Sequence, residues 1–183
     1  MLSKVAENPP EIASVLHIAD GDCRADELHA QGFAGTIGIY GDLLYEGPIP
    51  AGLTRAEFIR FRARFMADAG YTTFDEALAY YRFHEATLES ARKHAETVLW
   101  FDHRFSNQPM LIRVLEWFGQ NPELKVRFAI GTPVTTARCA LASKAWQAVT
   151  TQDPAAIEAF LQTDTTALPH LIPALRRHLE VFP

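Results

Sequence analysis

Four short apolar segments, each ending at a turn signal, predict the strands of the fold. Glycine or aspartate follows every one of them, as is common where a strand gives way to a turn. The third segment is apolar throughout, which is typical of a strand covered on both faces. The expected strands lie at 14–19, 36–40, 97–101 and 124–130.

Helical segments separate these strands. Thr54 with Glu57, and Thr73 with Glu76, form two capping boxes, and each box predicts a helix that begins there. Asp22 is positioned to cap a helix after the first strand. The remaining helices are expected from Ser106 or Asn107 to Gly119, over 135–149, from Pro154 onward, and at 175–179.

This alternation predicts an α/β fold, a small and mostly parallel sheet with helices on both faces. A helix between two strands allows the right-handed crossover that parallel strands need. After Gly131 the pattern is helical only, so we expect an α/β domain at 1–131 and a helical C-terminal segment at 132–183 packed on it. Trp100 and Phe118 lie in apolar stretches and are expected in the core.

Composition favours a cytoplasmic globular protein without a membrane partner, and disfavours nucleic acid. The chain has 183 residues and a formal net charge of -5, whereas nucleic-acid binders usually present a basic face. Residues 1–13 form a polar leader unlike a secretory signal, and no stretch of about 18 apolar residues is long enough to cross a membrane. Cys23 and Cys139 are expected to be reduced thiols.

Polar residues gather where the predicted strands end, and this pattern is the basis of our site hypothesis. In open α/β sheets, ligands bind at the carboxyl edge of the strands, toward which helix N-termini also point. The expected catalytic residues are His17, Asp22 and His103. The expected ligand-binding residues are Asp42, Glu46, Asp102 and Gln108.

These assignments have structural alternatives. Aspartate after a strand often serves only a turn or a helix cap, as Asp22 would. His17, between Leu16 and Ile18, fits a core position as well as a catalytic one. Four arginines on the first capped helix form either a solvated face or a clamp for an anion, namely Arg55, Arg60, Arg62 and Arg64.

The cofactor stays open, with a divalent metal as one candidate. Converging carboxylates raise one another's pKa unless a cation lies among them, and Mg²⁺ or Mn²⁺ suits such ligands. The spacing fits no fixed metal motif, however, and the sequence contains no GxSxG, GxxxxGK[ST] or GxGxxG pattern. Cys23 lies at a predicted helix start but has no identifiable base partner.

Motifs spread along the chain carry a family resemblance. They are His17-Ile18, Gly21-Asp22, Asp42 with Glu46-Gly47-Pro48, Leu99-Trp100-Phe101 with Gln108, Pro133-Val134-Thr135, Asp164 with Ala167-Leu168-Pro169, and Leu175-Arg176-Arg177-His178-Leu179-Glu180. Together they resemble the bacterial domain of unknown function numbered 1835, over nearly the whole chain. The resemblance implies a cytosolic bacterial α/β protein whose family-like set is His17, Asp22, Asp42, Glu46 and Asp102.

Three departures from the family pattern accompany this resemblance. Family members carry more acidic residues where this chain has Arg104 and Asn107. They also have a longer insert at the position of Gly131-Thr132, and they continue beyond Pro183 into a small helical domain. The first departure bears on any shared activity, and the second on a loop of the site.

Two functions follow as hypotheses. The first is an enzyme-like site that binds a small anionic molecule, with nucleotides among the candidates, at the carboxyl edge of the sheet. The second is a non-catalytic regulatory or partner-binding module that contacts another protein or a second copy of the chain. Clustered strand-end polar residues favour the first, and Arg104 with Asn107 favours the second.

Overall fold

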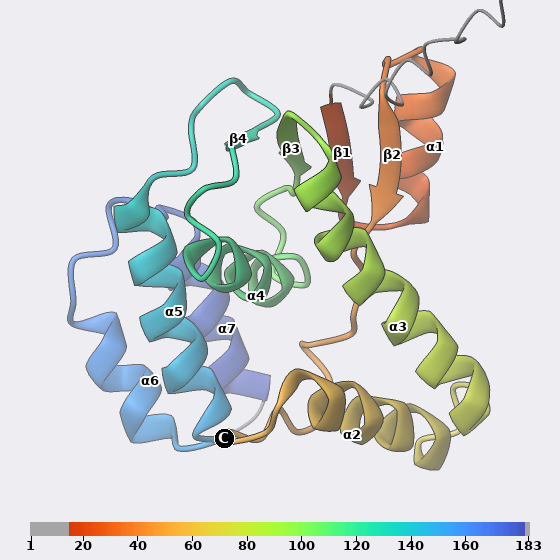
Figure 1. Cartoon of the computed structure of the whole chain (residues 1–183). Coiled ribbons are helices and arrows are strands. Elements are labelled where there is room, and N and C mark those ends of the chain that lie inside the picture. The colour runs from red at the N-terminus through yellow and green to blue at the C-terminus, as the bar shows by residue number, and fades with distance from the viewer. Residues whose placement is uncertain (1–14, 182–183) are drawn as a thin grey trace, which may run out of the picture.

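A four-stranded, all-parallel sheet forms the centre of the molecule (Figure 1). The computed structural model describes residues 15–181. The strands are β1 (Val15–Ala19), β2 (Thr36–Ile39), β3 (Glu96–Trp100) and β4 (Val126–Phe128). All four coincide with the predicted segments, except that β3 begins one residue earlier at Glu96, and no two of them form an antiparallel hairpin. The predicted fold class is therefore confirmed.

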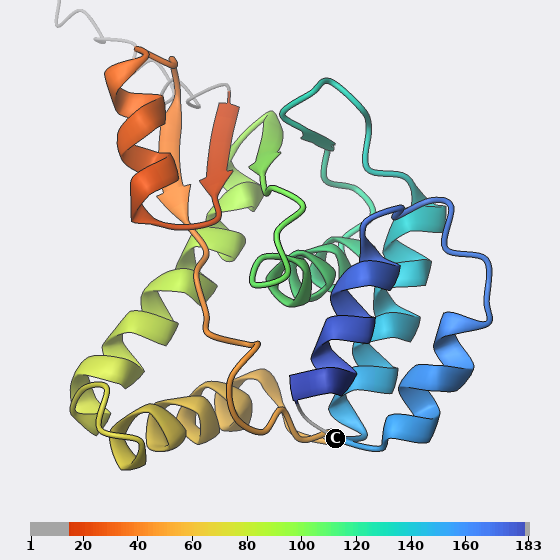
Figure 2. The ribbon, with the colours of Figure 1, turned by 180° about the vertical axis from the view of Figure 1, so that it is seen from behind.

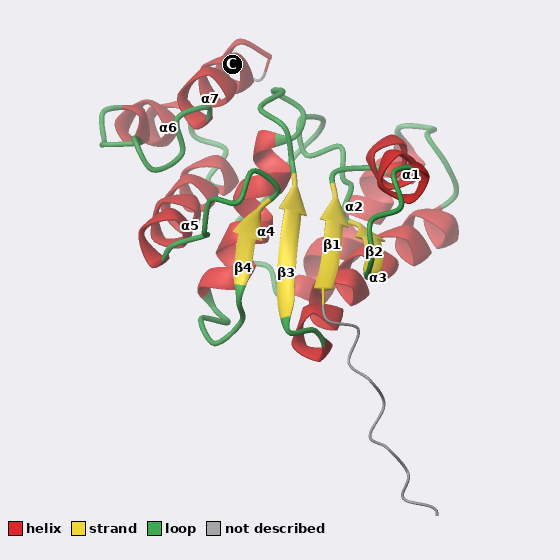
Figure 3. Ribbon diagram, turned by 90° about the horizontal axis from the view of Figure 1, so that it is seen from above, coloured by secondary structure: helices red, strands yellow, loops and turns green. Residues whose placement is uncertain are grey.

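The strand order, β2-β1-β3-β4, reverses direction at β1 (Figure 3). From β1 the chain crosses to β2 on one side, and β3 pairs with β1 on the other side, where Ala19 is in register with Trp100. Such a reversal leaves a crevice outside the carboxyl ends of the two strands, because their following helices leave toward opposite faces. In this fold the reversal falls between the ends of β1 and β3.

Helices cover both faces of the sheet. On one face, α1 (Asp22–Ala30) packs Ala25 and Leu28 against Ile37 and Trp100. On the other face, α3 (Phe74–Ser90) and α4 (Gln108–Gly119) bury the outward side chains of β1 and β3. A single 3₁₀ turn, η1 (Ala91–Lys93), continues α3. Successive side chains of β1 point to opposite faces of the sheet, as they do in any strand, so Leu16 and Ile18 lie on one face and Ala19 on the other.

The connection between β2 and β3 contains a helical hairpin of α2 (Arg55–Asp68) and α3 (Figure 1). Both predicted capping boxes are formed, because Thr54 and Thr73 each accept a hydrogen bond from the backbone N–H three residues later. The hairpin has a small apolar cluster of its own, built from Ala63, Leu78 and Tyr81. Local sequence signals thus determine where both helices begin.

Three C-terminal helices form a layer against α4 on the β4 side of the sheet (Figures 2 and 3). They are α5 (Thr136–Thr150), α6 (Pro154–Leu161) and α7 (Leu171–Val181). The main apolar cluster runs without interruption from Leu16 in β1 through α4 to Leu175 in α7. The C-terminal segment therefore shares the core of the α/β part.

The segment after β4 folds back along its outer edge. The Phe128 N–H donates to the Thr132 carbonyl at 2.8 Å, and the Val134 N–H donates to the Val126 carbonyl at 3.1 Å. Gly131 has a φ of 83°, a left-handed conformation that glycine adopts without strain. This turn explains why β4 ends at Phe128, two residues before the predicted end of the strand.

Several local expectations are corrected. Gly21, not Asp22, precedes α1, and no side chain caps this helix. Asn107 stands before α4, but its backbone is helical and its side chain caps nothing. Phe118 is buried as predicted, whereas Trp100 is only partly buried. The predicted leader at 1–13 lies outside the described residues. Among residues 15–181, no helix has the length and apolar character needed to cross a membrane.

Candidate functional site

Two carboxylates lie close together after the ends of β1 and β3. Asp20 follows β1 and Asp102 lies two residues after β3, and the amide of Asn107 donates to both, at 2.5 Å to Asp20 Oδ2 and 2.7 Å to Asp102 Oδ1. The backbone N–H of Asp102 also donates to Asp20 at 3.3 Å. A single side chain thus ties together the loops that leave the two central strands.

The two carboxylates differ in their electrostatic environment. Burial, and to a lesser extent the charge of Asp102, raises the pKa of Asp20. Burial has the same tendency at Asp102, but hydrogen bonds from the backbone and guanidinium of Arg104 prevail and lower its pKa. Arg104 Nε lies 2.5 Å from Asp102 Oδ2. Asp102 is therefore the more firmly ionised member of the pair.

A cavity of about 450 Å³ opens beside this cluster. It lies between the carboxyl ends of β3 and β4 and the segment that leads into α7. Most of its wall is apolar, and the residues that form that wall are Leu99, Phe101, Leu111, Phe128, Ala129, Ile130, Ala167, Leu168 and Pro169. Its size and lining are those of small-molecule sites in proteins.

Four polar side chains of this cavity have hydrogen-bonding capacity to spare. The rings of His103 and His170 lie 5.1 Å apart, and neither forms a hydrogen bond with a described residue. Gln108 donates from Nε2 to the Asp102 carbonyl at 2.9 Å, and no described residue donates to its Oε1. Arg138 donates to the carbonyls of Ala167 and Pro133. The cavity therefore combines apolar walls with unused donors and acceptors.

Arg138 brings a positive charge to the cavity that no described carboxylate lies close enough to pair with. Its guanidinium is held by neutral carbonyl groups, with Nε 3.0 Å from the Ala167 oxygen, and it lies over the Phe128 ring. A guanidinium in this situation retains its full charge for an anionic group. Neither Arg138 nor His170 was predicted as a site residue, because both lie beyond the last strand, where no strand end points to a site.

His17 lies away from this cavity and has a structural role. It is buried, its Nε2 lies 3.2 Å from the Ala34 carbonyl, and its Nδ1 accepts a hydrogen bond from the Trp100 indole at 2.9 Å. Both ring nitrogens are therefore occupied, and Phe33 packs on the ring edge. The histidine joins β1 to β3 and to the turn after α1, which agrees with the core alternative.

Asp42 is also a structural residue. Its carboxylate accepts hydrogen bonds from Arg62 at 3.1 Å and from the Tyr81 hydroxyl at 2.8 Å, and it is almost completely buried. Burial raises the pKa of Asp42, while the Arg62 guanidinium opposes this effect. Glu46, in the same loop, accepts a hydrogen bond from Tyr71. Neither carboxylate lines the cavity beside Asp102.

Asp22 lies near the end of β2. The negative charge of Asp22 tends to raise the pKa of Tyr80 and of His84, both in α3. His84 is buried, its Nδ1 lies 2.9 Å from the Gly41 nitrogen and 2.5 Å from the Gly41 oxygen, and burial lowers its pKa to about 4. The structure thus divides the predicted residues: Asp102, His103 and Gln108 line the cavity, and Asp22 lies near α3.

A metal ion has no ready-made site in residues 15–181, since no three histidine, cysteine, aspartate or glutamate side chains there are arranged to hold one. Asp20 and Asp102 converge, but their nearest partners are the amide of Asn107 and the guanidinium of Arg104. These donors satisfy the carboxylates, as a cation would. The hydrogen bonds of this cluster therefore join the loops that follow β1 and β3 beside the cavity.

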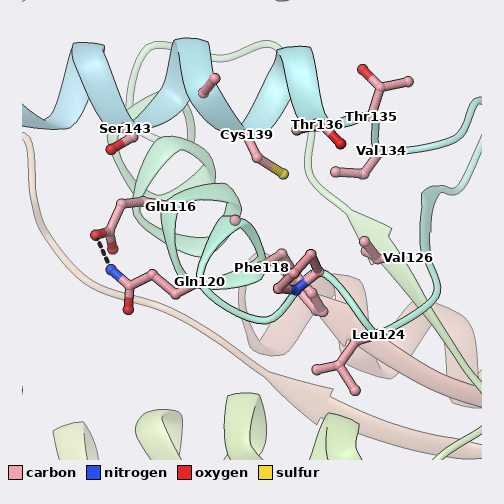
Figure 4. Close-up of a pocket in the computed structure, with 13 residues that line it drawn as sticks. Glu116, Phe118, Gln120, Leu124, Val126, Val134, Thr135, Thr136, Cys139 and Ser143 are labelled. Atoms are coloured by element: carbon pink, nitrogen blue, oxygen red, sulfur yellow. Dashed lines mark hydrogen bonds between the residues drawn. The ribbon is translucent and has the colours of Figure 1, made fainter.

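A second cavity, of about 300 Å³, lies beside the start of β4, between the end of α4 and the start of α5 (Figure 4). Cys139 points into it, and burial raises the pKa of this thiol. Its charged lining residue, Glu116, accepts a hydrogen bond from Gln120. A buried thiol with a raised pKa is a poor nucleophile, so the cavity at the carboxyl edge is the better candidate.

Comparison with known proteins adds no relative. No family model matches the sequence, and neither a curated protein nor a solved structure matches it. The resemblance to the domain of unknown function numbered 1835 therefore stays a prediction.

Proposed function

We propose that the protein binds a small anionic molecule with a planar, partly apolar body, and that nucleotides are the first class to test. The observation that carries this proposal is the cavity at the carboxyl edge of β3 and β4, in which apolar walls surround unused hydrogen-bonding groups. Gln108 is buried, and a ligand donor would satisfy its Oε1, which accepts no hydrogen bond from a described residue. His103 and His170 are exposed, and they offer their ring nitrogens to a ligand in place of water.

Each part of the cavity suits one part of such a ligand. Phe101, Leu111 and Leu168 offer an apolar lining for a ring. Arg138, whose charge is unpaired among the described residues, attracts a phosphate or a carboxylate. His103 and His170 lie where they would contact the polar part of the ligand, and they are the groups available for proton transfer if a reaction takes place here.

The proposal is tested by thermal shift and calorimetric titration with nucleoside phosphates, sugar phosphates and their neutral parent compounds. An Ala129→Phe substitution fills the proposed cavity, and an Ala140→Phe substitution fills the second cavity as a matched control. We expect a phosphate compound to raise Tm in the parent protein and in the Ala140 variant, but not in the Ala129 variant. Unchanged binding by the Ala129 variant, or no response to any compound, would refute the proposal.

A second candidate function, binding of a protein partner or a second copy of the chain, is favoured by aromatic residues exposed on the α2–α3 hairpin. Tyr71, Tyr80 and Phe83 are 52%, 46% and 56% exposed, and exposed apolar side chains that gather in one region often mark an interface. Sedimentation of the parent protein and of a Phe83→Ser variant tests self-association. A monomer at all concentrations would exclude the second copy as partner.

A further inference from the structure

We infer that Gln108 makes the cavity selective for ligands that place an exocyclic amino group against it, and therefore for amino-substituted rings over their keto counterparts. This inference rests on the proposed function and deepens it, because it names a chemical class of ligand. Gln108 is the first residue of α4, its side chain is only 4% exposed, and it lines the cavity together with Asp102.

The orientation of the Gln108 amide is determined by its neighbour. A backbone carbonyl can only accept a hydrogen bond, so the group 2.9 Å from the Asp102 oxygen must be the NH₂ of the amide. Asp102 is itself held in place by Asn107 and Arg104. The amide therefore cannot flip without losing this hydrogen bond. Its oxygen, Oε1, is held on the side of the amide that faces away from the Asp102 carbonyl.

The Gln108 oxygen is not fully enclosed by the described residues, and none of them donates a hydrogen bond to it. Since the residue is otherwise buried and lines the cavity, the space that Oε1 reaches is that of the ligand. An acceptor at this point favours a ligand N–H and repels a ligand carbonyl.

This arrangement distinguishes heteroaromatic rings by one functional group. Adenine and cytosine carry an exocyclic amino group where hypoxanthine and uracil carry a keto oxygen. A keto ring placed against Oε1 would leave two acceptors facing each other in a poorly solvated space, and a site of this kind rejects the wrong analogue strongly. We therefore expect amino-substituted nucleotides to bind about tenfold or more tightly than the matched keto nucleotides.

The test is calorimetric titration with two matched pairs, adenosine against inosine monophosphate and cytidine against uridine monophosphate. In the parent protein the amino member of a pair should bind about tenfold more tightly. In Gln108→Met, which keeps the length of the side chain but removes the acceptor, the two members should bind almost equally. Gln120→Met, at the far end of α4, is the matched control and should keep the preference.

The possible outcomes separate this inference from the proposed function. If both members of each pair bind equally to the parent protein, or if the keto members bind more tightly, the selectivity is refuted while the ligand site stands. If no member of either pair binds, the nucleotide form of the proposed function fails and the inference fails with it. A preference that Gln108→Met keeps would also refute the inference, because another group of the cavity would then be its source.

Discussion

Asn107 links two carboxylates, a role that its position in the sequence does not predict. An asparagine just before an amphipathic helix predicts a side-chain cap, yet here its φ of -91° and ψ of -21° are helical and the side chain turns to Asp20 and Asp102. The sequence alone cannot tell a helix cap from a link between two loops. The difference depends on the ends of β1 and β3 being neighbours in the fold.

Replacement of Asn107 by alanine should destabilise the protein by about 1–3 kcal/mol, because two partly buried carboxylates lose a shared donor and face each other directly. Urea unfolding at pH 7 measures the effect. Gln120→Ala is a suitable control, since among the described residues its amide bonds only to Glu116, at the exposed end of α4. A loss below about 0.5 kcal/mol at Asn107 would show that water replaces the amide at no cost.

His84 should make stability depend on pH between about 6.5 and 4. Burial lowers its pKa from 6.5 to about 4, so in this range the unfolded chain takes up a proton at this position that the folded chain does not. Stability is therefore complete above pH 6.5 and is lost as the pH falls toward 4, by about 3 kcal/mol at most.

The dependence is measured as the free energy of unfolding in urea at pH 7 and at pH 4.5. His84→Gln should lose less stability between the two pH values than the parent protein does. His29→Gln, at an exposed position on α1, should behave as the parent does. Equal losses in the parent and in His84→Gln would show that this imidazole takes up its proton in the folded state.

At the scale of elements, the loop between β2 and α2 is organised by one arginine. Arg62 is completely buried, and it donates to the carbonyls of Leu43, Glu46 and Pro48 as well as to Asp42. The expectation that it lies on a solvated face or clamps an anion is therefore wrong. A glycine at position 47 completes the loop, since a Cβ there would lie 2.2 Å from Phe65.

Replacement of Arg62 by methionine should cost about 3–5 kcal/mol, because the Asp42 carboxylate would stay buried without its counter-charge. Arg64→Met on the same helix is the control. Its guanidinium lies over Phe74 at an exposed position, and we expect a loss below about 1 kcal/mol there. Urea unfolding distinguishes the two variants, and similar losses in both would contradict a supporting role for Arg62.

The sequence predicts well where the helices and strands lie, but it predicts poorly which of them contact one another in the fold. Capping boxes and apolar runs act within a few residues, so the starts of α2 and α3 and the positions of all four strands could be predicted. The candidate site depends on contacts between distant segments. Asp42 and Asp102 look alike in sequence, and only the fold shows that Arg62 covers one while the other reaches a cavity.

At the scale of the whole molecule, the helical C-terminal segment is part of the core. Ala142 and Ala145 of α5 are completely buried in the cluster that contains Leu115 and Phe118 of α4, and a Cβ at Gly119 would lie 3.1 Å from the Cβ of Cys139. Close approach of the two helices relies on small residues on both sides.

A fragment of residues 1–131 should therefore fail to fold cooperatively. Removal of α5, α6 and α7 would expose the apolar side of α4 and open the cavity on the side of Arg138 and His170. Circular dichroism during urea titration should show no sharp transition for the fragment and a sharp one for the full chain. A sharp transition in the fragment would make the first 131 residues an independent domain.

The fold-back after β4 also decides where the sheet is vulnerable to aggregation. An edge strand with unpaired N–H and C=O groups is a template for adding strands from other molecules. The chain itself occupies the edge at β4, with Pro133 opposite Arg127. Among the described residues β2 pairs only with β1, so β2 is the open edge of this part of the sheet. Hydrogen–deuterium exchange should be slow at the amides of Phe128 and Val134 and fast at the outward amides of β2. Fast exchange at Phe128 would show that the β4 edge opens in solution and is exposed to intermolecular pairing as well.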